Sequence, residues 1–560
     1  MINIRKLEAE LWESADLLRA GSKLTSNQYC MPVLGLIFLR YAYSRFKLVE
    51  AEILKDRPMR GGRVLPVEAS DFASRSALFL PCEAQYAYLV TLPQNIPAAG
   101  LTNWRGEVMN SLGEVVNNAM ELVEQQSEQL SGVLPKDYTM FSDELLTELL
   151  RIFSNSALDE VGGDIVGRIY EYFLNKFAKN IAQDDGVFFT PKSLVKMIVN
   201  VLEPTQGILL DPACGSGGMF VQTGDFVEHA GMRANNTMTF YGQEKVEYNA
   251  QLCLMNLAVH GLTGVVKSGD EANTFYHDAH NLVGECDYVM ANPPFNVDKV
   301  KSESAQSAGR LPFGLPSVNK NKEVGNANYL WISYFYAYLN EQGRAGFVMA
   351  SSATDSQGKD KDIREQLVKT GHVDVMISVG NNFFYTKSLP CSLWFFDKGK
   401  KEELRDKVLF IDARNYYTVV DRTLNEWSEW QLKNLNAIEK TFMDLMDLAN
   451  SMDQEEQRYV REGFSSDEEL SLYDLLFSEN LSKQDIQKIK QVAVDLLAKV
   501  KAKIAELDHW TDKQETKAAV DNLIRDTLWA ELPECYDEVS ISGYRQKIYE
   551  YVYTRYPDVA

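Results

Sequence analysis

The stretch that decides the fold spans residues 207–220 and reads Gly207-Ile208-Leu209-Leu210-Asp211-Pro212-Ala213-Cys214-Gly215-Ser216-Gly217-Gly218-Met219-Phe220. A short apolar run ends in an acid, a glycine-rich turn follows, and a helical pattern starts at once. Such a turn brings backbone N–H groups close to a ligand at the carboxyl edge of a parallel sheet. It lacks the Gly-x-Gly-x-x-Gly and Gly-Lys-Ser/Thr patterns of dinucleotide and triphosphate sites. A glycine turn alone is also consistent with packing only, but we expect it to bind a cofactor through Asp211, Gly215, Ser216, Gly217 and Gly218.

Around this turn, apolar runs alternate with helical stretches, which predicts an α/β fold with a doubly wound, Rossmann-like sheet over residues 156–420. The expected strands are 207–210, 238–242, 265–267, 287–291, 344–349, 373–379, 392–396 and 408–412. Before it, helical periodicity in 5–46, 104–129 and 142–154 predicts an all-helical domain over residues 1–155. After it, strands are expected to disappear, and an apolar stripe along 482–507 predicts a C-terminal helical assembly region over residues 421–560.

The composition fits a folded protein, with 45% hydrophobic and 24% charged residues among 560, a length that suits about three domains. The net charge of -22 argues against a chain that grips a phosphate backbone alone, so a partner is expected to supply that grip. The excess of acidic residues is equally consistent with acidic side chains spread over solvated helix faces. Neither a membrane span nor a signal peptide is evident, and we expect a cytoplasmic protein without membrane contact. The seven scattered cysteines are interpreted as reduced core thiols, and no metal site is expected from His277 and His280.

Two acids stand at the ends of the next two expected strands. Glu244 follows the glycine turn by roughly 25 to 30 residues, near the spacing at which such folds bind ribose hydroxyls, and we expect it to do so. It is also placed to stabilise the start of the helix near Val246 through the macrodipole. Asp270 could accept from an exocyclic amine of the cofactor, although alone it reads as a turn residue.

The tetrapeptide Asn292-Pro293-Pro294-Phe295 follows the strand expected at 287–291. The lone pair of an exocyclic base amine is delocalised into the ring, so the amine is a poor nucleophile. The Asn292 side-chain carbonyl and the Pro293 backbone carbonyl could take its two hydrogens and aim the nitrogen at an electrophilic methyl group. The prolines would hold the loop, and Phe295 would stack on a base rotated out of its duplex. Alone this is a simple turn, but after a glycine turn and two strand-end acids it predicts methyl transfer to a planar amine.

A further candidate segment, which precedes the helix expected at 193–202, contains Val187, Phe188, Phe189, Thr190, Pro191 and Lys192. Thr190 is expected to be the N-cap and Pro191 the first helical residue. A helix start offers free N–H groups to a ligand carboxylate, so all six residues are assigned to cofactor binding. Capping without a ligand fits the same pattern.

In this order, Phe-Phe-Thr-Pro, Asp-Pro-Ala-Cys-Gly-Ser-Gly-Gly, Gly-Gln-Glu and Asn-Pro-Pro-Phe resemble the gamma-ordered N6-adenine DNA methyltransferases. The closest likeness is to the modification subunit of type I restriction-modification systems, and it covers roughly residues 5 to 445. It implies S-adenosyl-L-methionine as cofactor, double-stranded DNA with a flipped-out adenine as substrate, and Asn292 to Phe295 as the adenine site. It further implies two copies of this chain on each specificity subunit, which restriction subunits can join.

The tail from about Ser465 instead resembles the C-terminal helical region of type I restriction subunits, which predicts an assembly element. Two other functions stay open at this point. One is methyl transfer to a guanine amine of RNA or a glutamine amide of a protein, which uses the same Asn-Pro-Pro-aromatic loop. The other is a non-catalytic scaffold that binds the cofactor.

Overall fold

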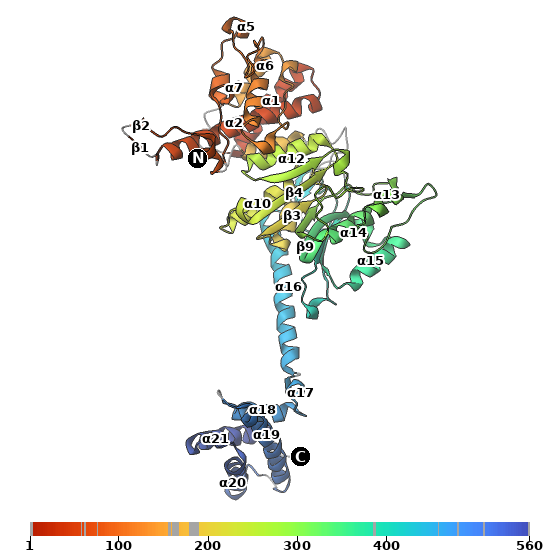
Figure 1. Ribbon diagram of the computed structural model, residues 1–560. Coiled ribbons are helices and arrows are strands. Elements are labelled where there is room, and N and C mark those ends of the chain that lie inside the picture. The colour runs from red at the N-terminus through yellow and green to blue at the C-terminus, as the bar shows by residue number, and fades with distance from the viewer. Residues whose placement is uncertain are drawn as a thin grey trace. The chain divides into compact units, whose positions relative to one another are not determined.

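The computed structural model (Figure 1) describes residues 4–55, 57, 59–60, 63–75, 77–154, 158, 167–177, 190–384, 388–456, 458–478, 481–507 and 510–557. The predicted ligand residues Val187, Phe188 and Phe189 lie outside these ranges. The chain divides into two compact units, residues 1–440 and 441–560. The domain boundaries predicted at residues 155 and 420 therefore stay predictions.

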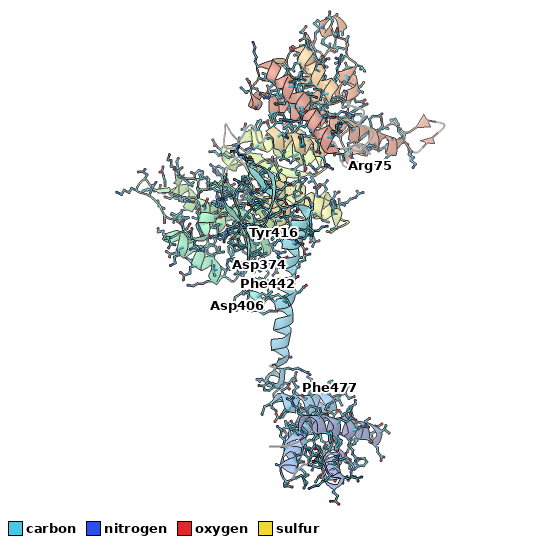
Figure 2. The ribbon with its side chains drawn as sticks, turned by 180° about the vertical axis from the view of Figure 1, so that it is seen from behind. Arg75, Asp374, Asp406, Tyr416, Phe442 and Phe477 are labelled. Carbon is cyan, nitrogen blue, oxygen red and sulfur yellow. The ribbon has the colours of Figure 1, made fainter. Side chains whose placement is uncertain are left out.

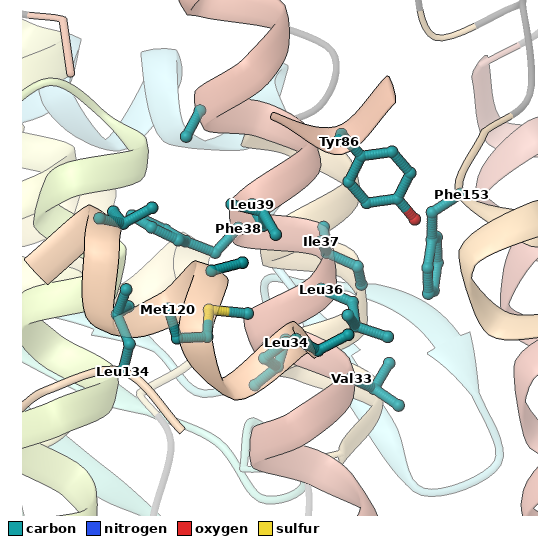
Figure 3. Close-up of a cluster of buried hydrophobic side chains, with 14 of the residues drawn as sticks. Val33, Leu34, Leu36, Ile37, Phe38, Leu39, Tyr86, Met120, Leu134 and Phe153 are labelled. Atoms are coloured by element: carbon teal, nitrogen blue, oxygen red, sulfur yellow. The ribbon is translucent and has the colours of Figure 1, made fainter. Parts of the chain in front are cut away.

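The N-terminal region is built around two long helices and the shorter ones that cover them. They are α1 (Ile4–Ser22), α2 (Ser26–Lys55), α3 (Ala69–Ala73), α4 (Tyr86–Val90), α5 (Ile96–Ala99), α6 (Leu112–Glu124) and α7 (Asp143–Ile152). Figure 3 shows the apolar residues 33–39 of α2 packed among Tyr86, Met120, Leu134 and Phe153. Each fully buried side chain of this kind contributes about 1.5–3 kcal/mol, so α2 is the centre of this core.

Two expectations for this region are corrected. The helix expected over 104–129 is α6, because a turn at Gly106 (φ 83°) precedes it and the Ser111 side chain caps it by accepting from the N–H of Glu114. The region is also not all-helical, because β1 (Met59–Arg60) and β2 (Arg63–Val64) form an antiparallel pair.

Helix α12 (Glu247–Val259) joins this region to the sheet. Its Leu252, Met255 and Val259 belong to the same buried cluster as α2, and so do five side chains of the helical residues 167–177. In Figure 1, α12 lies between the N-terminal helices and the strands. The N-terminal helices are therefore anchored along α12, beside the sheet.

The central sheet has eight strands in the order β12-β10-β11-β9-β6-β3-β4-β5. Their bounds are β3 (Gly207–Asp211), β4 (Met238–Glu244), β5 (Gly264–Ser268), β6 (Cys286–Ala291), β9 (Leu339–Ala350), β10 (Val373–Val379), β11 (Cys391–Asp397) and β12 (Leu409–Ala413). All neighbours are parallel except that β11 runs antiparallel to β9 and β10. The predicted doubly wound α/β fold is confirmed, and the strand order changes direction at β3, where such sheets bind ligands.

Helices cover both faces of the sheet. They include α9 (Lys192–Leu202), α10 (Gly218–His229), α14 (Asn328–Tyr338) and α15 (Lys359–Lys369). Phe347 and Met349 of β9 share a cluster with α14, whereas Gly346, directly before Phe347, lies against Ile198 of α9. Because successive strand residues point to opposite faces, α9 and α14 lie on opposite sides of the sheet.

Short elements interrupt this pattern after β6 and after β12. The first group is β7 (Val300–Lys301), α13 (Ser302–Ser307) and β8 (Glu323–Val324). The second is the antiparallel pair β13 (Thr418–Asp421) and β14 (Leu424–Glu426), so strands do not end at residue 420 as expected. The long helix α16 (Glu429–Glu456) follows, and Tyr416 lies beside its first turns (Figure 2), where its hydroxyl accepts from Nδ2 of Asn434 at 2.8 Å.

Residues 458–557 form a helical bundle with its own core. Its helices are α17 (Arg458–Arg461), α18 (Asp467–Leu476), α19 (Lys483–Ala505), α20 (Gln514–Glu531) and α21 (Glu538–Arg555). The stripe predicted in 482–507 is buried at its centre, with Ile489, Leu496 and Val500 facing this core. Within the described residues, no helix is both long and apolar enough to cross a membrane.

Candidate active site

The glycine turn after β3 is shaped by two glycines with positive φ, Gly215 (51°) and Gly217 (79°), and α10 begins directly after it. The N–H of Ala213 donates to Oδ1 of Asp211 (3.0 Å), and the N–H of Gly217 donates to the carbonyl of Cys214 (2.8 Å). A Cβ built on Gly215 or Gly218 would meet no atom within 4 Å. The turn therefore leaves open space above its backbone, which is what a bound cofactor requires.

Asp211 is buried at the end of β3. Burial raises the pKa of its carboxyl to about 8, with a smaller contribution from the nearby charge of Glu244, although the hydrogen bond from Ala213 opposes both. A carboxyl with this pKa is largely protonated at neutral pH, so it can donate as well as accept.

Glu244 at the end of β4 holds the turn from the neighbouring strand. Its Oε2 accepts from the N–H of Gly215 (3.1 Å) and its Oε1 from the N–H of Val246 (2.8 Å). Burial raises the pKa of Glu244 in spite of these bonds. Because α12 starts at Glu247, the helix-start interpretation of Glu244 also fits. Each oxygen keeps a second lone pair, so a ribose hydroxyl could still be accepted.

Asp270 lies at the same edge, in the short 3-10 turn Asp270–Ala272 after β5, and is exposed. The N–H of Gly269 donates to the carbonyl of Glu244 (3.2 Å), which keeps the ends of β4 and β5 together. Nε2 of His280 lies 2.8 Å from the carbonyl oxygen of Gly242, at hydrogen-bond distance. Among the described residues, no three His, Cys, Asp or Glu side chains are grouped so that they could hold a metal ion.

Asn292 follows β6 at the same edge. Its Nδ2 donates to the Thr190 hydroxyl (2.9 Å), and its Oδ1 is buried and accepts from no described residue. Pro293 is buried, Pro294 is exposed, and Phe295 is half-buried with its ring edge-on to Phe384 (centroids 5.9 Å apart, planes at 77°). A buried acceptor without a donor is costly, and a bound amine would satisfy this one.

The sequence led us to expect Thr190 as the N-cap of α9, and this expectation is wrong. The N-cap is Pro191, whose side chain has no group that could cap the helix, and the Thr190 hydroxyl accepts from Nδ2 of Asn292. Lys192 pairs with Glu171 (2.7 Å), which also contacts Nε2 of His260 (3.2 Å). Thr190 and Lys192 thus connect the loop of Asn292 with the helical residues 167–177.

Two positioning residues were missed by sequence reasoning. Gln243 is fully buried, and its amide bonds Thr274 (3.0 Å) and the N–H of Ala279 (3.0 Å), which anchors the loop after β5. Asn328 accepts from the N–H of Asn296 (2.8 Å) and donates to its side chain (2.9 Å), which fixes the turn after Phe295. Gln243 stands directly before Glu244 in the sequence, which was the available signal, whereas Asn328 is 32 residues from Asn296 and no local pattern marks it.

The geometry therefore combines an open glycine turn, a strand-end acid and an unpaired acceptor at one sheet edge. The family model N-6 DNA Methylase matches residues 161–469, more than half of the chain. The chain belongs to this family. The methylase also matches the HsdM N-terminal domain over residues 7–153.

Curated relatives of this methylase are methylase subunits of type I restriction enzymes. The MjaIX subunit of Methanocaldococcus jannaschii is 34% identical over 453 residues, which cover 77% of this chain and 76% of that subunit. The HindI subunit of Haemophilus influenzae is 31% identical over 338 residues, which cover 58% of this chain and 73% of that subunit. These relatives confirm the resemblance stated from the sequence.

Solved structures with the same fold include a type I restriction-modification methyltransferase subunit from Streptococcus thermophilus. It has a TM-score of 0.62 at 19% identity and covers 78% of this methylase and 93% of its own chain. A modification subunit of a putative type I restriction enzyme from Vibrio vulnificus has a TM-score of 0.54 at 16% identity, covering 78% and 89%.

A third family model, the C-terminal region of HindI-like type I endonuclease subunits, matches residues 403–539. This confirms the separate likeness of the tail to restriction subunits. This match overlaps the N-6 DNA Methylase match over residues 403–469.

Proposed function

We propose that the chain transfers a methyl group to the N6 amine of adenine in a specific DNA sequence, as the modification subunit of a type I restriction-modification system. The observation that carries this proposal is Oδ1 of Asn292, a buried acceptor with no donor among the described residues. The family membership and the type I relatives supply the substrate class.

S-adenosyl-L-methionine, when bound, supplies an electrophilic methyl group to the amine nitrogen. The chain's own residues would orient that nitrogen. Asn292 Oδ1 and the Pro293 carbonyl would accept the two amine hydrogens, and the half-buried Phe295 ring would stack on the base. Asp211, the glycine turn and Glu244 would hold the cofactor, with Asp270 near its adenine and residues 187–192 near its carboxylate.

The partners are proposed from the charge and from the resemblance to modification subunits. A chain with a net charge of -22 has little to neutralise DNA phosphates, so a specificity subunit is proposed to bind the duplex and deliver a flipped adenine. Two copies of this chain on each specificity subunit, and a restriction subunit that joins them, complete the proposed complex.

The tail is proposed as an assembly element. Its buried cluster is built from residues of 464–552 alone, so it has a core of its own. Deletion of residues 465–560 should abolish capture by the specificity subunit while cofactor binding, measured by calorimetry, stays within about threefold. Capture of the truncated chain at the parent's affinity would refute this role.

The experiment for the whole proposal is methyl transfer from labelled cofactor to DNA, with and without the specificity subunit, followed by nucleoside analysis. N6-methyladenine formed only with the specificity subunit supports it. Cofactor binding without any transfer in the full complex would favour the scaffold alternative.

A further inference from the structure

The hydrogen bond between Thr190 and Asn292 connects two segments that are 102 residues apart in sequence. Thr190 stands directly before Pro191, which restricts its backbone, and as a β-branched residue it has few rotamers. Its hydroxyl therefore occupies a well-defined place beside the catalytic loop.

The orientation of the Asn292 amide decides whether it can serve the amine. With Nδ2 on the Thr190 hydroxyl, Oδ1 is the atom left without a partner. In the reversed orientation an NH2 group would face the substrate amine, and two donors cannot pair. An amide that donates through Nδ2 is also polarised, which strengthens Oδ1 as an acceptor.

We propose that Thr190 is a positioning residue for methyl transfer, which accepts from Nδ2 of Asn292 and holds Oδ1 toward the target amine. This inference rests on the proposed function and adds a role that differs from the cofactor binding first expected of Thr190. Without the hydroxyl, Nδ2 loses this acceptor, so the amide is free to turn and Oδ1 is no longer held in place.

The two roles of Thr190 separate in the kinetics. A residue that binds the cofactor changes the Kd of the cofactor. A residue that orients Asn292 changes the rate of the chemical step with cofactor bound and leaves that Kd nearly constant.

The test compares Thr190→Val, which keeps the shape, with Thr190→Ser, which keeps the hydroxyl, in the full chain assembled with specificity subunit and duplex. Under single-turnover conditions Thr190→Val should lower the rate constant roughly 10- to 100-fold, and Thr190→Ser should stay within about threefold of the parent. The cofactor Kd should change less than about threefold in both variants.

Ser193→Ala is the matched control, because this hydroxyl lies in the first turn of α9 and is buried with no partner among the described residues. It should methylate at the parent's rate, and all variants should melt within about 2 °C of the parent. If Thr190→Val methylates at the parent's rate, or if weaker cofactor binding accounts for its whole loss of rate, the inference about Thr190 is wrong while the proposed function stands. A parent complex that methylates no adenine would overturn the proposed function and this inference with it.

Discussion

The backbone N–H of Gly215 donates a 3.1 Å hydrogen bond to Oε2 of Glu244, which ties the glycine turn after β3 to the end of β4. The same carboxylate accepts from Val246, so one side chain holds both the turn and the start of the next helical segment. The shape of the cofactor site therefore depends on a contact between neighbouring strands.

Glu244→Gln should weaken cofactor binding by about 10- to 100-fold, because a neutral amide offers one acceptor oxygen where the carboxylate offers two. Calorimetric titration with S-adenosyl-L-methionine measures this. Glu247→Gln is the control, since it removes the same charge from an exposed site three residues away. Equal Kd values for Glu244→Gln and the parent would mean that Glu244 is only a helix-start acid.

Gly217 and Gly218 should respond differently to alanine. A Cβ on Gly217 would lie 2.7 Å from Sγ of Cys253 at a φ of 79°, so Gly217→Ala should cost about 1–3 kcal/mol of stability as well as cofactor affinity. Gly218→Ala meets only open space and should keep the parent's melting temperature. If it still weakens cofactor binding about tenfold or more, the cofactor occupies that space; unchanged binding would place it elsewhere.

The fold was predictable because each strand of the sheet contains a short apolar run, although β9 (Leu339–Ala350) begins five residues before the strand expected at 344–349. The role of Thr190 was not, because its hydroxyl serves Asn292 and a local pattern shows only a capping position. Gln243 and Asn328 were missed for the same reason, since both anchor loops through tertiary contacts. Two cysteines expected in the core, Cys82 and Cys535, are exposed.

Asp211→Asn should make the protein more stable, increasingly so as the pH rises from 5 to 8. The folded state raises the pKa of Asp211 to about 8, so across this range the folded protein holds a proton that the unfolded chain has lost. The Asp211 carboxyl therefore lowers the free energy of unfolding as the pH rises, by at most about 1.4 kcal/mol per pH unit. Melting temperatures of both proteins across this range test it, and a constant difference would contradict it.

Glu171→Gln should destabilise the first unit by about 1–3 kcal/mol at pH 6 and by less at pH 9. Burial opposes ionisation of Glu171, but His260 and Lys192 lower its pKa to about 2. Burial would lower the pKa of His260, yet Glu171 raises it, so the stabilisation from this pair is lost as the pH rises through that pKa. Urea unfolding at the two pH values measures the change.

The exposed pair Lys47–Glu50 provides the control for Glu171→Gln. Glu50→Gln should cost no more than about 0.5 kcal/mol at either pH, because exposed ion pairs contribute little. An equal cost for the two substitutions would show that the buried cluster has no special role.

The most direct measurement of the central claim is methyl transfer by the parent and by Asn292→Ala, each assembled with the specificity subunit on duplex DNA and labelled cofactor. We expect N6-methyladenine from the parent, a loss on the order of 10³-fold in Asn292→Ala, and the same cofactor Kd in both. An Asn292→Ala complex as active as the parent, or label that enters RNA or protein instead of DNA, would contradict it.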